Sequence, residues 1–505
     1  MMNFQNNNDP SHGFSDSKLL LIILLFFALF INGTSQNRPL DSSQIVAQIG
    51  NKTITVEDFL QRSELTVRPV YLKDKNTAIN NLIAEKTLAL EAEGSATEFL
   101  NKPGIAGKLR GIKEQMMREA LYYEVAFNKA QVDTTEINKV YRSSMREYEL
   151  EFYVLKSKDL AQKVQTVLDS MPELTDKMFE EFAGAIDKKP VHRINYNDNE
   201  DDVIHKALYS ELLDTGTVLG PLRLNDGNYI IMKVTDYIDY PLISSEDQRL
   251  RWNKVQNKLH QAAASKLWQE FQADLMHGKK VEFDPNSFEV LKNLAFEMYL
   301  SSDATDSINF QIAEIVPSKP EINPNAPFFR IDDQTWTIDD FKRELLAHPL
   351  IFRTRNLTKD NFAEQFKLAV VDLIRDYYLT QESYKRGLDQ SPEIDRTLAI
   401  WQDALIAQNQ IKTVLKEAVS NGIINDDPEE LAKYRETYIK KLQAKYSSNI
   451  RINLKVYEQI SLNKVDFFAY RPGMPHPTTI PAFPVLIQSG DLTYAKQTID
   501  STKHK

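Results

Sequence analysis

The amino-acid sequence predicts an α+β fold that is mostly helical, with a helical unit that carries an inserted α/β module and is followed by a second copy of the helical unit. Three observations support this prediction: a motif that occurs twice, long stretches with apolar residues at helical spacing, and one central segment in which short strands and helices alternate. The chain has 505 residues, too many for one hydrophobic core, so about two to four domains are expected.

The repeated motif reads VAQIGNKTITVEDF at 46–59 and FFRIDDQTWTIDDF at 328–341. Each copy has the pattern of a short strand, a tight turn, a second short strand and the start of a helix. Identical residues stand 282 positions apart, as Thr53 and Thr335 do (335 − 53) and Phe59 and Phe341 do (341 − 59). A long recurrence at constant spacing indicates a duplicated unit. Chance similarity between two such openings is the alternative.

The first helical unit is predicted over 41–149 and 240–290. Helices are expected over 76–93, where Gly94 would end the helix, and over 107–130. Asp133 and Glu136 have the spacing of a capping box and predict a further helix start. After the inserted module, a long helix is expected over 246–276, ending at Gly278, with a short strand over 280–283.

The inserted α/β module is predicted over 150–239. Strands are expected at 150–155 and 227–234, because both are apolar runs and the second follows a turn at Gly227. Helices are expected over 160–168, 177–182 and 205–213.

Prolines separate the remaining parts. Four of them within 316–327 predict a semi-rigid linker. The second helical unit is predicted over 328–460, with one helix over 362–387 and a long one that begins at Pro392, where proline suits a first helical turn. A second proline cluster begins at Pro472, and residues 461–505 are predicted to form an irregular C-terminal tail.

Residues 1–36 have the pattern of a targeting segment. Leu19–Ile31 is an uncharged apolar run of 13 residues, with Lys18 before it and small polar residues after it. A spanning helix needs about 20 apolar residues, whereas a signal-peptide core needs about 7–15. The run therefore predicts an export signal and a periplasmic protein. Because no A-x-A cleavage site follows, a membrane tether that leaves the chain facing the periplasm remains the alternative.

Composition argues against several kinds of function. The net charge of −10, without a concentrated basic run, argues against binding of nucleic acid. The absence of cysteine excludes thiol catalysis, disulfides, cysteine-ligated zinc and a lipoprotein anchor, and it suits an oxidising compartment. GxSxG, HExxH, P-loop and dinucleotide-binding motifs are absent, and the eight histidines are scattered. We therefore expect no catalytic residue of these classes, no cofactor and no metal.

The order of these parts resembles the SurA-like periplasmic chaperones and their PpiD and PrsA relatives, a family that carries parvulin-type prolyl isomerase domains. VAQIGNKTITVEDF is similar to the start of that family, and DTTEINKVYRSSMREY to its helix before the isomerase domain. TGTVLGPLRLNDGNYIIMKV is similar to the end of a parvulin domain. NIRINLKVYEQI, at 449–460, resembles the first strand of an isomerase domain that does not follow.

The departures from the parvulin pattern concern the catalytic positions. Parvulin sites have one histidine in the first strand and another in the last. The corresponding residues here are Phe152 and Ile230, or Tyr153 and Tyr229 if the register shifts by one. The resemblance therefore implies a parvulin-like domain that lacks the usual histidines.

The glycine-rich GGDLG element of parvulins is also missing, and VHRINYNDNEDD stands in its place. His192 and His205 lie near this segment but fit neither catalytic position. We expect both to be surface histidines.

The resemblance implies an ATP-independent chaperone that binds unfolded exported proteins, with outer-membrane β-barrel proteins as the expected clients. Such a protein needs adaptable apolar surface, and the chain has 25 Phe, 21 Tyr and 11 Met to build it. The alternative is an active parvulin-type peptidyl-prolyl cis-trans isomerase that assists the folding of exported proteins. A structural subunit of the cell envelope is a third hypothesis.

Overall fold

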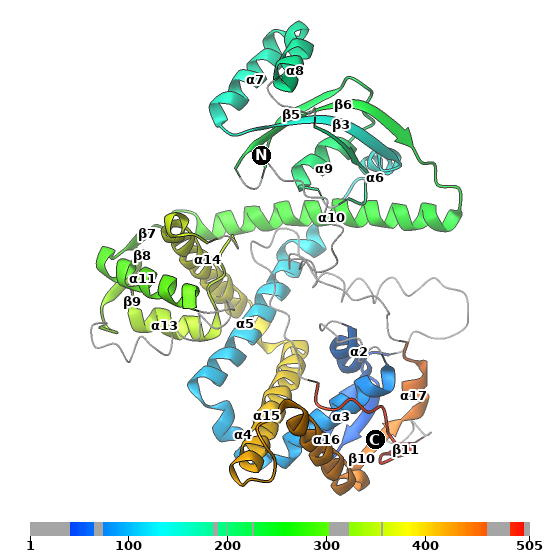
Figure 1. The fold of residues 1–505 in the computed structure, drawn as a ribbon, viewed down its shortest axis with the longest axis vertical. Helices are drawn as coiled ribbons and strands as arrows, with labels where there is room; N and C mark the ends of the chain where they lie inside the picture. The colour runs from blue at the N-terminus through cyan, green and yellow to red at the C-terminus, as the bar shows by residue number, and fades with distance from the viewer. Residues whose placement is uncertain are drawn as a thin grey trace. The chain divides into compact units, whose positions relative to one another are not determined.

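The computed structural model describes residues 41–64, 74–184, 190–198, 200–224, 227–301, 323–354, 357–461 and 485–498. This part is α+β and mostly helical, as predicted (Figure 1). The run Leu19–Ile31 lies outside the described residues, as do most of the predicted linker and the proline-rich part of the tail. No helix in the described ranges has the length and apolar character that crossing a membrane requires.

The chain divides into two compact units. The first unit contains the residues up to Tyr123 and those from Gln269 onward, and the second contains Glu124–Trp268. Sheet A of the first unit has the order β11 (Lys496–Thr498), β10 (Ile450–Asn453), β1 (Ile45–Ile49), β2 (Lys52–Thr55). Sheet C has the order β7 (Val281–Phe283), β8 (Pro327–Ile331), β9 (Gln334–Thr337).

The helices of the first unit come from both ends and the middle of the chain. They are α2 (Val56–Glu64), α3 (Lys75–Glu91), α4 (Glu93–Leu100), α5 (Pro103–Val125, whose last residues enter the second unit), α11 (Pro285–Ser301), α13 (Ile338–Ala347), α14 (Lys359–Lys385), α15 (Pro392–Ser420), α16 (Pro428–Lys445) and α17 (Leu454–Gln459). The expected helix end at Gly94 was wrong, because a new helix, α4, begins at Glu93 and contains this glycine.

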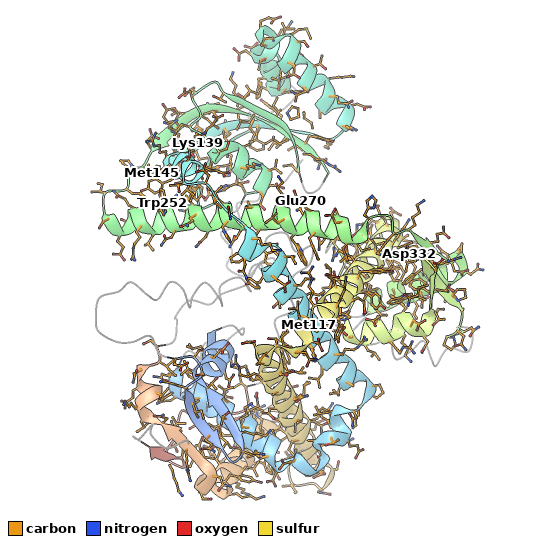
Figure 2. All side chains as sticks on the ribbon, turned by 180° about the vertical axis from the view of Figure 1, so that it is seen from behind. Met117, Lys139, Met145, Trp252, Glu270 and Asp332 are labelled. Atoms are coloured by element: carbon orange, nitrogen blue, oxygen red, sulfur yellow. The ribbon has the colours of Figure 1, made fainter. Side chains whose placement is uncertain are left out.

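The repeated motif folds in the same way in both places. In the first copy, the Asp58 backbone N–H donates to Thr55 Oγ1 at 3.1 Å and the Thr55 N–H donates to Asp58 Oδ2 at 2.9 Å. Thr337 and Asp340 make the same pair of bonds at the start of α13. The turns match as well, since Gly50 has φ 59° and Asp332, labelled in Figure 2, has φ 51°. The shared sequence thus encodes a hairpin and a capped helix start.

Each hairpin is completed by a strand from the other half of the chain. β10 pairs antiparallel with β1, placing Ile450 opposite Ile49 and Ile452 opposite Ala47. β7 pairs antiparallel with β8, placing Val281 opposite Ile331 and Phe283 opposite Phe329. The two registers are equivalent, because partners in both sheets are shifted by the same 282 positions on the hairpin side. The predicted boundaries follow chain order, whereas this strand pairing crosses between 41–290 and 328–460.

The long helices are exchanged in the same manner. α15, from the second half, packs against α3, where Asp403 accepts bonds from Lys86 Nζ at 2.7 Å and Lys52 Nζ at 2.6 Å. α5, from the first half, meets α14, where Arg118 Nη1 donates to Thr380 Oγ1 at 2.8 Å and the Met117 carbonyl (Figure 2) accepts from Ser383 Oγ at 3.4 Å.

The hydrophobic cores reflect this exchange. The core of sheet C contains Phe328, Phe341, Phe366, Val370 and Leu291, and the core of sheet A contains Val46, Phe59, Ile79, Ile452 and Val456. Both cores therefore need side chains from both halves of the chain.

The second unit is the inserted α/β module. Its sheet B is antiparallel, with the order β4 (Val191–Ile194), β3 (Arg146–Leu155), β6 (Tyr229–Asp239), β5 (Val218–Arg223). Its helices are α6 (Thr134–Ser143), α7 (Lys158–Ser170), α8 (Thr175–Gly184), α9 (Asp202–Tyr209) and most of α10 (Ser245–Met276). α7 and α8 lie on one side of the sheet and α9 on the other (Figure 1).

Contacts between α6 and α10 join the two ends of the module. The rings of Tyr141 and Trp252 lie 5.5 Å apart, and Figure 2 shows Lys139 and Met145 near Trp252. Val255 of α10 is fully buried in the same core as β3 and β6.

Replacement of Gly111 tests how closely α5 packs against the end of α13. A Cβ at Gly111 would lie 1.8 Å from the Ala347 carbonyl oxygen, whereas a Cβ at Gly94 in α4 meets nothing within 4 Å. We expect Gly111→Ala to lower the free energy of unfolding by about 1–3 kcal/mol or more through steric overlap. Gly94→Ala should leave it unchanged or raise it by up to about 1 kcal/mol. Urea unfolding of both variants measures the difference, and equal effects would contradict this packing.

Candidate functional site

The face of sheet B that contacts α9 carries Phe152 and Ile230, the two residues that the resemblance predicts at the histidine positions of parvulins. Phe152 is paired with Met232, and Ile230 with Val154 on the same two strands. Ile230 and Met232 are buried in one core cluster with Leu208 of α9, and Phe152 packs against it. These two positions therefore lie on one face of the sheet and contribute apolar side chains to its core.

The neighbouring residues Tyr153 and Tyr229 lie on the opposite face, because side chains alternate along a strand. There they pack with Phe179, Val164 and Ile231 beneath α7 and α8. The Tyr153 hydroxyl donates to Glu151 Oε1 at 2.8 Å. Burial, and next the Glu151 carboxylate, raise the pKa of Tyr153 well above its ordinary value, so this hydroxyl keeps its proton at neutral pH.

His205 lies in α9 and is buried with 4% exposure, so the expectation of a surface histidine was wrong at this position. Its ring packs 4.7 Å from Tyr196 and 4.8 Å from Tyr209. Its Nε2 lies 3.1 Å from the Tyr196 carbonyl oxygen, and because a carbonyl only accepts, we assign the proton to this nitrogen. Burial lowers the pKa of His205 to about 4, so the ring is neutral at physiological pH. Its contacts are those of a core histidine.

His192 lies on the edge strand β4 with about half of its side chain exposed (47%), as expected for a surface histidine. Its Nε2 is 3.7 Å from Glu200 Oε1, beyond hydrogen-bond distance. In the strands of sheet B as the structure describes them, it is the one histidine.

An open groove of about 530 Å³ runs between α7, α8 and the edge strand β5. Its walls are mostly polar, with Gln165 and Asp169 from α7, Asp176 from α8, and Gly216 and Val218 at the start of β5. Among the strands that the structure describes, β5 pairs with β6 alone, so the groove follows an open sheet edge. The sequence could not reveal this groove, since its walls come from segments about 50 residues apart.

The connection from β6 to α10 and the first turns of α10 expose large apolar side chains. Tyr240 is 52% exposed, Ile243 is 92% exposed and Leu250 is 55% exposed. These residues are close in the chain and leave apolar area in contact with water. Exposed apolar area of this kind is typical of surfaces that bind other polypeptides.

The described residues of the first unit contain one group of carboxylates and imidazole with the spacing of a metal site, Glu114, Glu344 and His348. Arg110 Nη1 already lies 2.9 Å from Glu344 Oε1, and His348 Nε2 lies 2.5 Å from Glu114 Oε2. Tyr384 donates to Glu114 Oε1 at 3.2 Å. Because the Arg110 guanidinium and the His348 ring already bind these two carboxylates, we interpret the group as a polar network that joins α5 to α13. The i, i+4 spacing of Arg110 and Glu114 is visible in the sequence, but their meeting with α13 is not.

Comparison with known proteins gives a distant likeness. No family model and no curated protein matches the sequence. Two solved structures are similar in part: foldase protein PrsA from Lactococcus lactis, with 11% identity over 45% of this chain and 93% of that chain and a TM-score of 0.17, and foldase protein PrsA from Streptococcus pneumoniae, with 14% identity over 44% and 91% and a TM-score of 0.16. Both likenesses cover less than half of this chain, and similarity at this level does not establish function.

The Glu114 network predicts a dependence of stability on pH. Burial raises the pKa of Glu114, but the bond with His348 and the charges of His348 and Arg110 outweigh it, and the net pKa is below the ordinary 4.5. A depressed carboxyl pKa gives stabilisation that is present above about pH 4.5 and is lost as pH falls through the lowered pKa.

We therefore expect Glu114→Gln to lower the free energy of unfolding by about 1–3 kcal/mol at pH 7 and to flatten its decline below pH 4.5. Glu98→Gln, at an exposed position of α4, is the matched control. Urea unfolding between pH 3 and 7 compares the three chains. An unchanged acid limb in the Glu114 variant would contradict the assignment.

Proposed function

We propose that this protein is an ATP-independent chaperone that binds unfolded exported proteins outside the cytoplasm. Its proposed clients are outer-membrane β-barrel proteins, and its proposed location is the periplasm, reached through the N-terminal signal or tether. In this proposal the inserted module holds polypeptide and performs no catalysis.

The proposal depends on a contrast within the inserted module, between its buried core and its accessible surface. Phe152 and Ile230, which we expect at the histidine positions of parvulins, pack in the core, and buried His205 is neutral and bound to a backbone carbonyl. The groove beside β5 and the exposed Ile243, by contrast, are accessible to a polypeptide. This combination supports binding without acid–base chemistry.

Prolyl isomerisation needs no nucleophile, because its barrier is rotation about a partial double bond of about 18–20 kcal/mol. An enzyme lowers this barrier by binding the twisted peptide more tightly than the planar one, usually in an apolar pocket. The groove of the module is lined mostly by polar groups, which favours holding an extended chain over enclosing a proline ring.

The chaperone proposal is tested by dilution of a urea-unfolded outer-membrane β-barrel protein into buffer with the purified chain from residue 37 onward. We expect light scattering to fall with increasing chain, without ATP. Ile243→Asp combined with Leu250→Asp should weaken this suppression, because the exposed apolar area is lost. Ile423→Asp, at a residue 60% exposed in the first unit, is the control. Scattering that the wild-type chain does not reduce would reject the proposal.

The absence of catalysis is tested by a protease-coupled assay on a proline peptide, whose uncatalysed isomerisation takes tens to hundreds of seconds. We expect the chain to leave this rate unchanged. An acceleration that disappears when Phe152 or Tyr229 is replaced would contradict this expectation and favour the alternative, an active isomerase.

A further inference from the structure

The edge of sheet A is occupied by the chain's own C-terminal segment. β11 lies parallel to β10, with Lys496 opposite Arg451 and Gln497 opposite Ile452. This is the geometry in which an extended peptide adds to a sheet edge and is held by main-chain hydrogen bonds.

Side chains of the first unit hold the preceding residues of this segment. Leu486 and Ile487 are each 2% exposed, in a cluster with residues of α3, α15 and α16. Asn81 Oδ1 accepts from the Leu486 N–H at 2.8 Å and the Ile487 N–H at 3.1 Å, and its Nδ2 donates to the Ile487 carbonyl at 2.6 Å. The bonds from Asn81 reach only backbone atoms, whereas the buried side chains of Leu486 and Ile487 add apolar contacts, so this surface is suited to extended segments that carry apolar residues.

β7 of sheet C is the counterpart of β10. Both complete a repeated hairpin in the same register, and both are followed by a helix with a side-chain cap. Asn453 Oδ1 accepts from the Val456 N–H, and Asp284 Oδ1 accepts from the Ser287 N–H, 169 positions earlier. In sheet C the order is β7-β8-β9, and in the ranges that the structure describes no strand pairs with the outer side of β7.

The backbone of β7 presents hydrogen-bonding groups to this outer side. The Asp284 N–H donates to the Phe328 carbonyl at 2.9 Å, so Asp284 faces β8. Because successive residues of an edge strand face opposite sides, the N–H and C=O of Phe283 face away from β8. Phe283 corresponds to Ile452, whose neighbour in sheet A is β11.

We propose that the outer edge of β7 docks an extended segment of an unfolded client, parallel to β7 and in the register that 496–498 takes on β10. This inference rests on the proposed chaperone function and names one binding site for it. Glu282 is exposed at the position that corresponds to Arg451. A client lysine bound at the position equivalent to Lys496 would face the Glu282 carboxylate of sheet C. In sheet A, by contrast, the tail's own Lys496 lies opposite the cation Arg451. The edge of β7 therefore favours basic segments.

The test uses the full chain and a synthetic peptide with the sequence of residues 485–498, followed by hydrogen–deuterium exchange. We expect the peptide to protect amides within 281–284. Glu282→Lys should weaken binding about two- to fivefold, the size of one exposed ion pair. The same peptide with glutamate in place of Lys496 should instead bind the Glu282→Lys variant more tightly than the wild-type chain. Asp333→Lys, at the fully exposed turn of the same sheet, is the charge-matched control.

The inference is overturned if the peptide does not protect the amides of 281–284. It is also overturned if amide exchange changes only at 450–453, because the peptide would then have displaced the tail from β10. Protection that grows with protein concentration in the absence of peptide would also overturn it, since the occupant would then be a second copy of this chain. If the chain suppresses client aggregation and β7 stays unprotected, the edge site is rejected while the chaperone proposal stands. Protection without suppression would support the edge site and reject the chaperone proposal.

Discussion

The pairing of β10 with β1 and of β7 with β8 is the constraint on which the first unit depends. A two-stranded hairpin is at best marginally stable alone, and a third strand with a packed face makes it stable. Here each hairpin receives its third strand from the other half of the chain, in the same register. Neither hairpin is therefore complete until both halves have met, and the cost of closing these long loops is offset by two cores and two exchanged helices.

Buried charges specify which long helix meets which half. Asp403 of α15 is held by Lys52 and Lys86, whereas the corresponding contact of α5 uses Glu114 with His348 and Arg110. Steric fit also restricts the place of α5, because a Cβ at Gly111 would lie 1.8 Å from the Ala347 carbonyl oxygen. An acid without its own basic partners would leave a buried charge unpaired, which is strongly destabilising. We interpret the two different networks as the device that keeps the two repeats from pairing in the wrong combination.

The sequence predicted what local rules determine. The repeated strand–turn–strand–helix opening and the apolar strands of the module follow from residues within a few positions of each other, and both were confirmed. The Thr–Asp bonds that cap the two helix starts are equally local, although they were recognised only in the structure. The exchange of β7 and β10 could not be predicted, since either strand could complete either hairpin on pattern alone. The positions of Phe152 and Ile230 on one sheet face follow from strand periodicity. The burial of His205 does not, because it depends on Tyr196 and Tyr209 across the core.

The second half of the chain also shows where the module is inserted. α16 begins after the capping residue Asp427 and ends at Lys445, five positions before β10. In the first half, α6 begins after the capping residue Asp133, and α10 ends at Met276, five positions before β7. The module therefore interrupts what is one continuous helix in the other copy. It adds no strand to sheet A or sheet C, so its groove and exposed apolar residues can change without disturbing the pairing that holds the two halves together.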